Sequence, residues 1–454
     1  MQAQTIQTTD AVDRKLPLGP LTVLGIQHVL VMYAGAITVP LIIGGALKLP
    51  PDQVAFLINA DLFASGIATL IQTLGFWGFG IRLPVMMGVT FAAVGPMIAI
   101  GTSPELGIQH IFGAGLVAGL IGILLAPAMS RLIAWFPPVV TGTVITVIGV
   151  TLMEVAINWS GGGVGNPNFG DPLYLAIALS VLVFIVCVMK FAKGFMSRIA
   201  VLMGILFGTL VAALCGKLTL AGVEYAPWFN VVTPFHFGWP RFDIASIAAM
   251  TIVLLVCYIE STGMFLAVGE ICGRPVDGQA LTRGLRTDGL GTVIGAVFNT
   301  FPYTSYSQNV GLVGVTGVRS RWVCVAGAII LVVLGTLPKL ATIVACVPPF
   351  VIGGAGIVMF GMVATTGIRI LADSNFQRNP HNFYIVAISL GVGLIPMVSQ
   401  KFFHAMPASL SPLLHSGILL ASVTAVILNR VFNGTSKTSL NDTKDTAAAG
   451  AGHH

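Results

Sequence analysis

The sequence predicts an all-α polytopic membrane protein with 14 transmembrane segments, and three observations lead to this fold class. Of the 454 residues, 56% are hydrophobic and only 8% are charged, whereas a soluble domain carries about 25% charged residues. The apolar residues gather into fourteen runs of roughly the length that crosses a bilayer, about 20 residues. The lysines and arginines between these runs fall mainly on alternate connections, as the positive-inside rule requires.

The fourteen spans follow one another with short connections. In chain order they are predicted at residues 21–43, 53–74, 84–101, 110–129, 137–158, 173–189, 199–216, 245–268, 280–299, 303–317, 323–338, 342–366, 382–399 and 409–432. An even number of spans places both termini on the same side of the membrane.

The basic residues decide which side that is. With the N-terminus in the cytoplasm, the inside segments carry 17 lysines and arginines and the outside segments 5, which together make the 22 of the chain. A missed span would exchange the two sides from that point onward, so this bias supports fourteen spans with both termini cytoplasmic. The net charge of +6 is then a topology signal, and the expected partner is membrane lipid and not nucleic acid.

The two ends of the chain are polar. Residues 1–20 form a cytoplasmic N-terminal segment that does not resemble a cleavable signal. Residues 433–454 are rich in Ser, Thr, Ala and Gly and are predicted to be a disordered tail. The six cysteines show no CxxC or Cys/His ligand spacing, so we interpret them as small buried apolar residues and expect no metal or cofactor.

The third and tenth spans are short and irregular. They read PVMMGVTFAAVGPMIAIG and PYTSYSQNVGLVGVTG, each starting with Pro and interrupted by Gly. They hold equivalent places in two halves of seven, and because seven is odd the second half enters the membrane inverted. Such a pair indicates the central site of a transporter, since irregular backbone at membrane depth needs protein or water around it. Two kinked helices packed through small residues are the simpler alternative.

Ionisable residues within spans are costly and are therefore candidates for function. Glu260 is the deepest acid, in the middle of the eighth span. Asp288 lies early in the ninth span and His28 lies mid-span in the first; a local helix cap and simple packing remain the alternatives for these two. Asp61 and Glu154 are weaker candidates, which we interpret mainly as structural.

The stretch SQNVGLVGVTG resembles the signature of the nucleobase–ascorbate transporter family, also called nucleobase:cation symporter-2. That signature is Gln or Glu, Asn, any residue and Gly, then four residues, Thr, and Arg, Lys or Gly. The resemblance covers essentially the whole chain and is strongest to the bacterial uric acid and xanthine permeases. The matching positions are Gln308, Asn309, Gly311, Thr316 and Gly317, with Gln27, His28, Glu260 and Asp288 in other spans.

The resemblance implies the family's fold, which has two inverted repeats of seven spans and a short strand with a half-helix in each broken span. A core domain comprises residues 21–132 (spans 1–4) and 243–340 (spans 8–11). A gate domain comprises residues 133–218 (spans 5–7) and 341–432 (spans 12–14), the latter also forming a homodimer. Residues 219–242 form an extracellular or periplasmic loop. The resemblance also implies elevator-type alternating access with proton symport in the bacterial inner membrane.

The expected substrates are oxidised purines, urate and xanthine, whose flat rings alternate N–H donors and C=O acceptors. Glu260 is expected to accept two ring N–H groups, and the Gln308 carboxamide to pair with an N–H/C=O edge. Phe91, in the broken third span, is expected to stack on the ring. Further hydrogen bonds are expected from Ala92, Ser307 and Ser261.

The remaining motif residues are expected to support this site. Asn309 should point away from substrate and brace the core helices, as its family counterpart does. An ionised carboxylate is expensive to carry across a membrane, so Glu260 is expected to hold the coupling proton. His28, beside Gln27, and Asp288 are expected to tune Glu260 or to support the contact between core and gate.

The end of the signature is expected to influence selectivity. Relatives of the uric acid permease type can carry Arg where this chain has Gly317, which follows Thr316. Without that side chain we expect a permissive transporter that accepts both xanthine and urate.

Other classes of protein remain as alternatives. A passive channel can also use polar breaks at membrane depth. An anion transporter of a related fourteen-span architecture should favour helix N-termini and a basic residue over a central Glu. A symporter for another nucleobase, such as uracil, guanine or hypoxanthine, is a further alternative. No nucleophile elbow or phosphate loop is present, so an enzyme is not expected.

Overall fold

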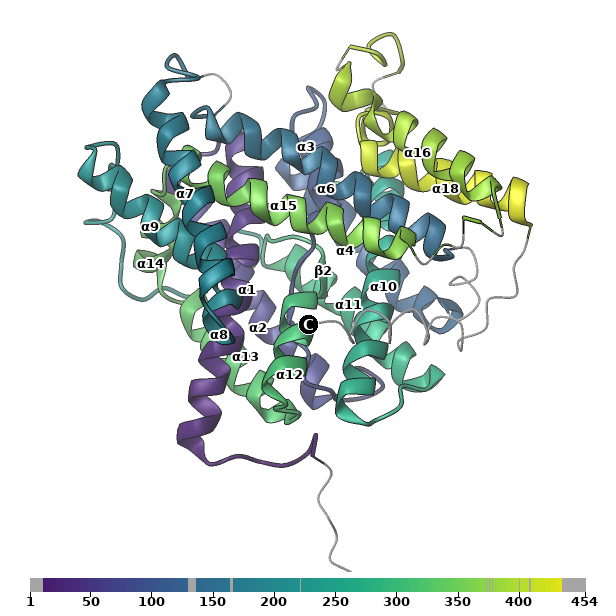
Figure 1. Ribbon diagram of the computed structural model, residues 1–454, viewed down its shortest axis with the longest axis horizontal. Helices are drawn as coiled ribbons and strands as arrows, with labels where there is room; N and C mark the ends of the chain where they lie inside the picture. The colour runs from purple at the N-terminus through teal and green to yellow at the C-terminus, as the bar shows by residue number, and fades with distance from the viewer. Residues whose placement is uncertain are drawn as a thin grey trace, which may run out of the picture.

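The computed structural model describes residues 11–129, 136–163, 166–220, 222–372, 374, 376–377, 379–399, 401–407 and 410–434. The first ten residues of the predicted N-terminal segment and residues 435–454 of the predicted tail lie outside these ranges. The described chain is built of helices around one small two-stranded sheet (Figure 1).

The first half of the chain contains one strand and mostly long helices. Its elements are α1 (Leu18–Ala46), α2 (Pro51–Leu74), β1 (Met87–Val89), η1 (Phe91–Ala93), α3 (Val94–Gly101), α4 (Ile108–Leu125), η2 (Ala126–Ala128), α6 (Pro138–Ser160), α7 (Pro172–Phe191), α8 (Phe195–Arg198) and α9 (Ala200–Leu214).

The second half repeats this order of elements. It comprises α10 (Ile244–Cys272), α11 (Gly278–Val297), β2 (Tyr303–Ser305), α12 (Ser307–Thr316), α13 (Arg321–Gly335), α14 (Pro338–Ala345), α15 (Pro349–Ala372), α16 (His381–Val398), α17 (Ser411–Leu414) and α18 (Gly417–Asn433).

A helix, or a strand followed by a helix, occupies each of the fourteen predicted ranges. Among the described residues, eight helices are long and apolar enough to span a membrane, or nine if the pair α13–α14, bent by 80°, is one span. The prediction of a multi-pass helical membrane protein is confirmed, and the number fourteen stays a prediction. The predicted boundary at residue 342 is wrong, because α14 ends at Ala345 and α15 begins at Pro349. Two consecutive prolines, Pro348 and Pro349, prevent one helix from running through.

Local signals in the sequence set the ends of the central helices. The Asp243 side chain caps α10 by accepting a hydrogen bond from the backbone N–H of Ser246 at 2.8 Å. At its other end α10 stops at Gly273 in a left-handed conformation. Asp277 caps α11 in the same way through the N–H of Ala280.

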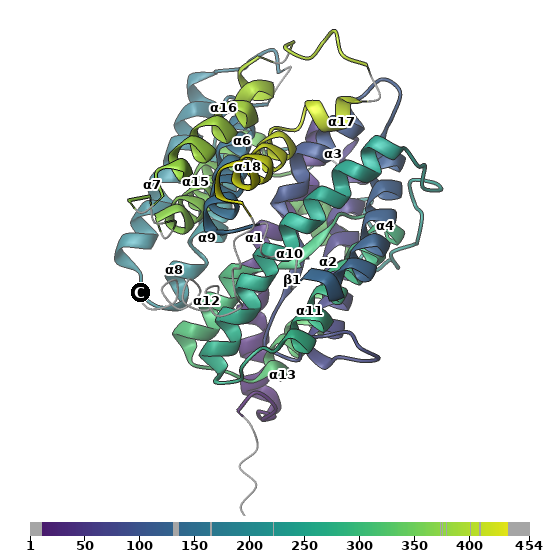
Figure 2. The same cartoon turned by 90° about the vertical axis from the view of Figure 1, so that its right-hand side faces the viewer.

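The helices form two groups that lie side by side in Figure 2. Most extensive contacts run between members of the same group. The first group contains α1, α2, α3, α4, α10, α11, α12 and α13, with both strands; the second contains α6, α7, α9, α15, α16 and α18.

Three closely packed helix pairs join the first half of the chain to the second. In the first group α4 packs against α11, and α13 against α2; in the second α6 packs against α15. Glycines allow these close approaches: a Cβ on Gly119 of α4 would lie 2.8 Å from the carbonyl oxygen of Gly289 in α11. Likewise a Cβ on Gly66 of α2 would lie 2.6 Å from the carbonyl oxygen of Ala328 in α13.

The connections of the first group meet at two opposite ends. Near the end of α10, Asp13 pairs with Arg321 at 2.6 Å and with Arg274 at 3.4 Å, and the N–H of Gly80 donates to the carbonyl of Arg283. All of these residues belong to predicted inside segments or to the helix turns beside them. The N-terminal segment is anchored at this end by Val12, which is fully buried.

The other end of α10 gathers segments that are predicted to lie outside. Gln109, in the first turn of α4, donates through Nε2 to the carbonyl of Phe237 at 2.8 Å, and its backbone carbonyl accepts from the N–H of Arg241. Connections of the first group that are predicted to be inside therefore meet at one end of α10, and those predicted to be outside meet at the other. This arrangement agrees with the alternation of basic residues along the sequence.

Candidate functional site

The centre of the first helix group is a pair of antiparallel strands contributed by the two halves of the chain. Met87 lies opposite Ser305, Gly88 opposite Thr304, and Val89 opposite Tyr303. Thus the polar stretches of the third and tenth predicted spans, far apart in sequence, meet in the fold.

A helix leaves each strand immediately. The turn η1 and then α3 follow β1, while α12 follows β2 at Ser307. Because the strands are antiparallel, these two half-helices start at opposite ends of the strand pair. Their N-termini, where backbone N–H groups are unsatisfied and the helix dipole is positive, both lie next to the sheet.

The helix α10 runs along this strand pair and contacts β2, η1 and α12. The Ser261 hydroxyl lies 3.1 Å from Thr304 Oγ1 and accepts a hydrogen bond from the backbone N–H of Ser305 at 3.3 Å. One turn earlier, Cys257 Sγ lies 3.3 Å from Thr90 Oγ1. These contacts place Glu260, the residue before Ser261, beside the sheet.

Some of the predicted site residues are accessible at the protein surface and others are buried. Ser307 and Gln308 are exposed, and Glu260 and Phe91 are partly exposed. Within the described chain the Glu260 carboxylate has no ion-pair or hydrogen-bond partner. Four side chains of the centre therefore remain accessible, on α10, η1 and the first turn of α12.

Two of these accessible side chains have a close neighbour. The Phe91 ring packs edge-on against Phe360 of α15, with ring centroids 5.7 Å apart, so it joins the two helix groups. The Ser307 hydroxyl donates to Gln308 Oε1 at 3.4 Å, the long end of the hydrogen-bond range.

Three neighbouring residues are buried and face the scaffold. Ser261 is fully buried, and its hydroxyl holds strand β2. Ala92 is 2% exposed and its backbone N–H donates to Thr90 Oγ1 at 3.1 Å, so that donor already has an acceptor. Asn309 is fully buried: its Nδ2 donates to the carbonyl of His28 at 2.9 Å and lies 3.1 Å from His28 Nδ1.

A polar stripe on α2 supports the sheet from behind. Thr69 Oγ1 accepts from the backbone N–H of Met87 at 2.9 Å. Gln72 Nε2 donates to Asp288 Oδ1 at 3.2 Å, and Gln72 Oε1 accepts from the N–H of Ile81 at 3.0 Å. Asp288 is fully buried and accepts a hydrogen bond from Gln72. It lies in the middle of α11, so it does not cap the N-terminus of that helix.

The remaining predicted residues lie outside this centre. Gln27 is partly exposed on α1. Thr316 Oγ1 accepts from the N–H of Val318 and donates to the carbonyl of Leu312 in its own helix. Gly317 ends α12 with φ +65°, a left-handed conformation that favours glycine.

Most of the scaffold contacts are made by residues outside the predicted site, namely Gln72, Thr69, Tyr303 and Thr90. Asp61, which the sequence predicts to be mainly structural, accepts the hydrogen bond from Tyr303. One signal was available: Asp61, Ser65, Thr69 and Gln72 follow one another at intervals of four, four and three residues, the spacing of one helix face.

The fold and its centre define a class. Several apolar helices of spanning length surround two interrupted segments that meet at strands, which is the arrangement of a multi-pass membrane transporter. The model of a permease family matches residues 19–402, and the chain belongs to this family, the nucleobase–ascorbate transporter family that the signature resembles.

Named relatives agree with this assignment. The chain is 57% identical over 427 residues to the uric acid transporter UacT of Escherichia coli, covering 94% of this chain and 89% of that protein. It is 45% identical over 414 residues to the xanthine permease of Bacillus subtilis, covering 91% and 94%. These relatives are named as a transporter and a permease, not as enzymes.

Solved structures share the fold at low sequence identity. The transmembrane domain of the cyanobacterial bicarbonate transporter BicA matches with a TM-score of 0.58 and 17% identity, covering 90% of this chain and 96% of that one. The murine anion transporter Slc26a9, in its inward-facing state, matches with a TM-score of 0.64 and 12% identity, covering 92% and 69%.

Proposed function

We propose that the protein takes up urate and xanthine together with protons, by elevator-type alternating access. The observation that carries this proposal is the strand pair flanked by an accessible carboxylate, Glu260, and an accessible carboxamide, Gln308. The names of the relatives, a uric acid transporter and a xanthine permease, support the same substrates.

The chemistry of the accessible side chains fits an oxidised purine. When ionised, the Glu260 carboxylate accepts from two adjacent ring N–H groups; when protonated, it accepts from one N–H and donates to one C=O. The Gln308 carboxamide donates to a C=O and accepts from an N–H. The Phe91 ring supplies a stacking surface. Ser307, exposed at the N-terminus of α12, adds a hydroxyl.

The buried neighbours hold these groups in position. In this proposal Asn309 and His28 fix α12 to α1, while Asp288 and Gln72 fix α11 to α2. The Ser261 hydroxyl and the Ala92 N–H stabilise the strand pair and its flanking turn, because both groups already form hydrogen bonds within the protein. The direct substrate contact expected of both residues from the sequence stays a prediction.

The same proposal includes fourteen spans in two inverted repeats of seven. The matched packing of α4 on α11 and of α13 on α2 supports it, because a seven-span shift converts one contact into the other. The first helix group is then the core domain and the second the gate domain, which also forms the homodimer. A proton-driven elevator moves the core against the gate, at contacts such as Phe91 with Phe360.

The proposed membrane location and topology follow from the distribution of lysine and arginine. The excess of lysine and arginine on one set of connections supports a bacterial inner membrane protein with both termini in the cytoplasm. The meeting of Asp13 with Arg274 and Arg321 at one end of α10 agrees with that topology.

An anion transporter is the second candidate, because the fold is shared with the bicarbonate transporter BicA and with Slc26a9. The side chains at the strand pair oppose it, because a small inorganic anion lacks the alternating ring N–H and C=O groups that Glu260 and Gln308 match. A uracil transporter is disfavoured by the family resemblance, which implies Glu in the uracil branch at the position where this chain has Gln308.

The test is radiolabelled uptake in cells that lack their own purine permeases. Xanthine, urate, hypoxanthine, guanine, uracil, ascorbate and bicarbonate are compared as substrates and competitors. We expect xanthine and urate to enter and to compete at low concentration, while uracil and bicarbonate do neither. Equal uptake of uracil, or transport of bicarbonate alone, would overturn the proposal.

A further inference from the structure

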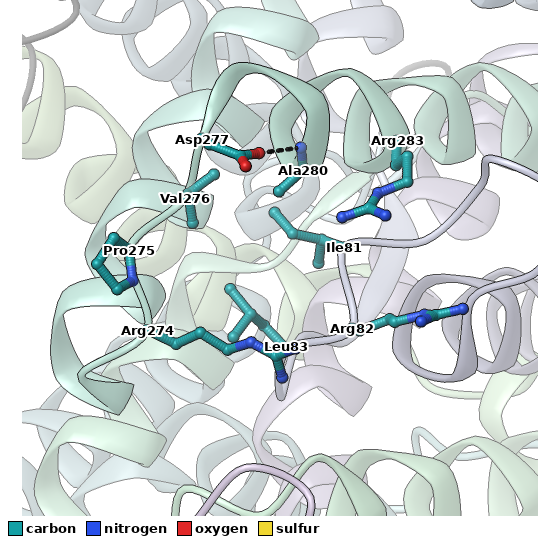
Figure 3. Close-up of a pocket in the computed structure, with 9 residues that line it drawn as sticks. All are labelled: Ile81, Arg82, Leu83, Arg274, Pro275, Val276, Asp277, Ala280 and Arg283. Atoms are coloured by element: carbon teal, nitrogen blue, oxygen red, sulfur yellow. Dashed lines mark hydrogen bonds between the residues drawn. The ribbon is translucent and has the colours of Figure 1, made fainter. Parts of the chain in front are cut away.

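A second polar site lies away from the strand pair, at the end of the core that holds the N-terminal segment. A cavity of about 290 Å³ lies between the segment that follows α2 and the turn that joins α10 to α11. Figure 3 shows the residues that line it. They are Ile81, Arg82, Leu83, Arg274, Pro275, Val276, Asp277, Ala280 and Arg283.

The charge of this lining is strongly unbalanced. It contains three arginines and one aspartate, a net charge of +2. The single carboxylate is already used, because Asp277 Oδ1 accepts from the N–H of Ala280 at 2.6 Å as the cap of α11. The α11 N-terminus adds the positive end of its helix dipole.

The arginines are arranged to bind a ligand. In Figure 3, Arg274 and Arg283 reach toward the segment Ile81–Leu83 from two sides, and Arg82 extends away from them. The Nε atom of Arg283 is buried and has no hydrogen-bond partner among the residues that the structure describes. A buried donor without an acceptor is costly, and more so when it is charged. Arg274 also contacts Asp13, with Arg274 Nη1 3.4 Å from Asp13 Oδ2, and both side chains are partly exposed.

We propose that this cavity binds a phosphate-bearing anion between Arg274 and Arg283. A guanidinium group matches the oxygen spacing of phosphate, and its pairs with phosphate are commonly bidentate. A phosphate oxygen supplies the acceptor that Arg283 Nε lacks. The source is either the headgroup of an anionic lipid, for which basic pockets between transmembrane helices are typical sites, or free phosphate.

The position gives such a ligand a consequence for the site. The segment before β1 is bound to α11 through the N–H of Gly80, which donates to Thr287 Oγ1 at 2.7 Å and to the carbonyl of Arg283. An anion held by Arg283 and Arg274 adds a link among this segment, α10 and α11. Those elements carry β1, Glu260 and Asp288, so the anion stabilises the core domain as a unit.

The experiment measures thermal unfolding of the purified, delipidated full-length protein in detergent. The probes are sodium phosphate against sodium chloride at equal ionic strength, and mixed micelles with phosphatidylglycerol against phosphatidylcholine. The variants are Arg283→Gln and Arg286→Gln, which lose the same charge from the same helix; only the first residue lines the cavity. Arg283→Lys keeps the positive charge but lacks the planar guanidinium group that can bind phosphate through two hydrogen bonds.

We expect phosphate or phosphatidylglycerol to raise the unfolding midpoint of the wild type and of Arg286→Gln. Arg283→Gln should bind the same probe about ten-fold more weakly, as expected for one lost charge-assisted bond, and Arg283→Lys should fall between. A response to phosphatidylglycerol alone identifies a lipid headgroup, and a response to both identifies phosphate itself. No response in the wild type, or equal responses in Arg283→Gln and Arg286→Gln, would overturn the proposal; the wild-type measurement stands even where a variant does not fold.

Discussion

The hydroxyl group of Tyr303 donates to Asp61 Oδ1 at 2.8 Å, which ties strand β2 to the middle of α2. Thr300 Oγ1 donates to the same carboxylate oxygen at 3.3 Å. Tyr303 is fully buried and Asp61 is 1% exposed. The position of the strand pair thus depends on a carboxylate that does not itself face the accessible side chains.

Tyr303→Phe removes that hydroxyl and keeps the ring. Leaving a buried polar group without its partner costs about 1–3 kcal/mol, so we expect a lower unfolding temperature and slower uptake with unchanged ranking of competing purines. Differential scanning fluorimetry and competition uptake measure the two effects. Tyr225→Phe, at a ring that is 89% exposed, is the control and should behave as wild type. An unchanged unfolding temperature in Tyr303→Phe would contradict this role.

Asn309 and His28 should act as one unit. Asn309→Ala removes both contacts between α12 and α1, whereas His28→Ala removes only the contact of Asn309 Nδ2 with the imidazole ring and leaves the backbone carbonyl in place. We therefore expect the stability loss of the double variant to be smaller than the sum of the single losses, by about 0.5–3 kcal/mol. Chemical denaturation of the wild type, the two single variants and the double variant measures this difference. A second cycle, with Gln27→Ala in place of His28→Ala, is the control. Strict additivity would show that the two residues act independently.

Gln308→Ala should leave the protein folded and in the membrane but abolish high-affinity uptake. An unpaired polar edge of a ligand costs about 1–3 kcal/mol, which is roughly a ten- to hundred-fold loss of affinity. Membrane abundance and uptake are measured together. Thr316→Ala, on the same helix and bonded within its own segment, is the matched control. Uptake by Gln308→Ala like that of the wild type would remove Gln308 from the proposed site.

Gly317 gives a prediction for selectivity. We expect the wild type to transport both xanthine and urate, each competing with the other. A side chain at φ +65° is strained by roughly 1–2 kcal/mol, so Gly317→Arg must be compared with Gly317→Asn, which tolerates this conformation better. If Gly317→Arg narrows the profile and Gly317→Asn does not, side-chain bulk and charge are responsible. A wild type that carries only one of the two purines, unaffected by the other, refutes the prediction.

Glu260→Gln tests proton coupling. The proposal requires Glu260 to carry a proton during the loaded crossing and to release it inside, because an ionised carboxylate is costly in the membrane interior. A permanently neutral side chain should keep some binding but lose accumulation driven by external acidification. Uptake with and without a protonophore measures this, and Glu224→Gln in the exposed loop before α10 is the control. Accumulation by Glu260→Gln that still collapses with protonophore would falsify Glu260 as the coupling residue.

The parts of the fold that sequence predicted well are those encoded locally. Runs of apolar residues located the long helices of the described chain, and glycine and proline located the two broken segments. The partners of the polar residues were not predictable in this way. Gln72 meets Asp288 across 216 positions and Asp61 meets Tyr303 across 242. Such contacts depend on how distant segments assemble, which hydrophobic periodicity does not encode.

The site residues show the same division. The signature singled out Gln308 and Asn309 together, yet one side chain is exposed and the other fully buried. Adjacent positions at the start of a helix point in different directions, so which one faces the ligand follows from the packing of α12 against α1. The motif identified the segment, and tertiary contacts assigned the individual roles.

The strand pair also has a consequence for biosynthesis. The hydroxyl of Tyr306 reaches the carbonyl of Val89 across 217 positions, and β1 pairs with no other strand in the described chain. At a synthesis rate of about 5–20 residues per second, β1 waits roughly 10–40 s for its partner after leaving the ribosome. During that time its backbone N–H and C=O groups lack their final partners at membrane depth, where each unsatisfied group costs several kcal/mol. We therefore expect the first half to reach its final fold only after the second half is made, and separately expressed halves to be stable only when both are made in the same cell.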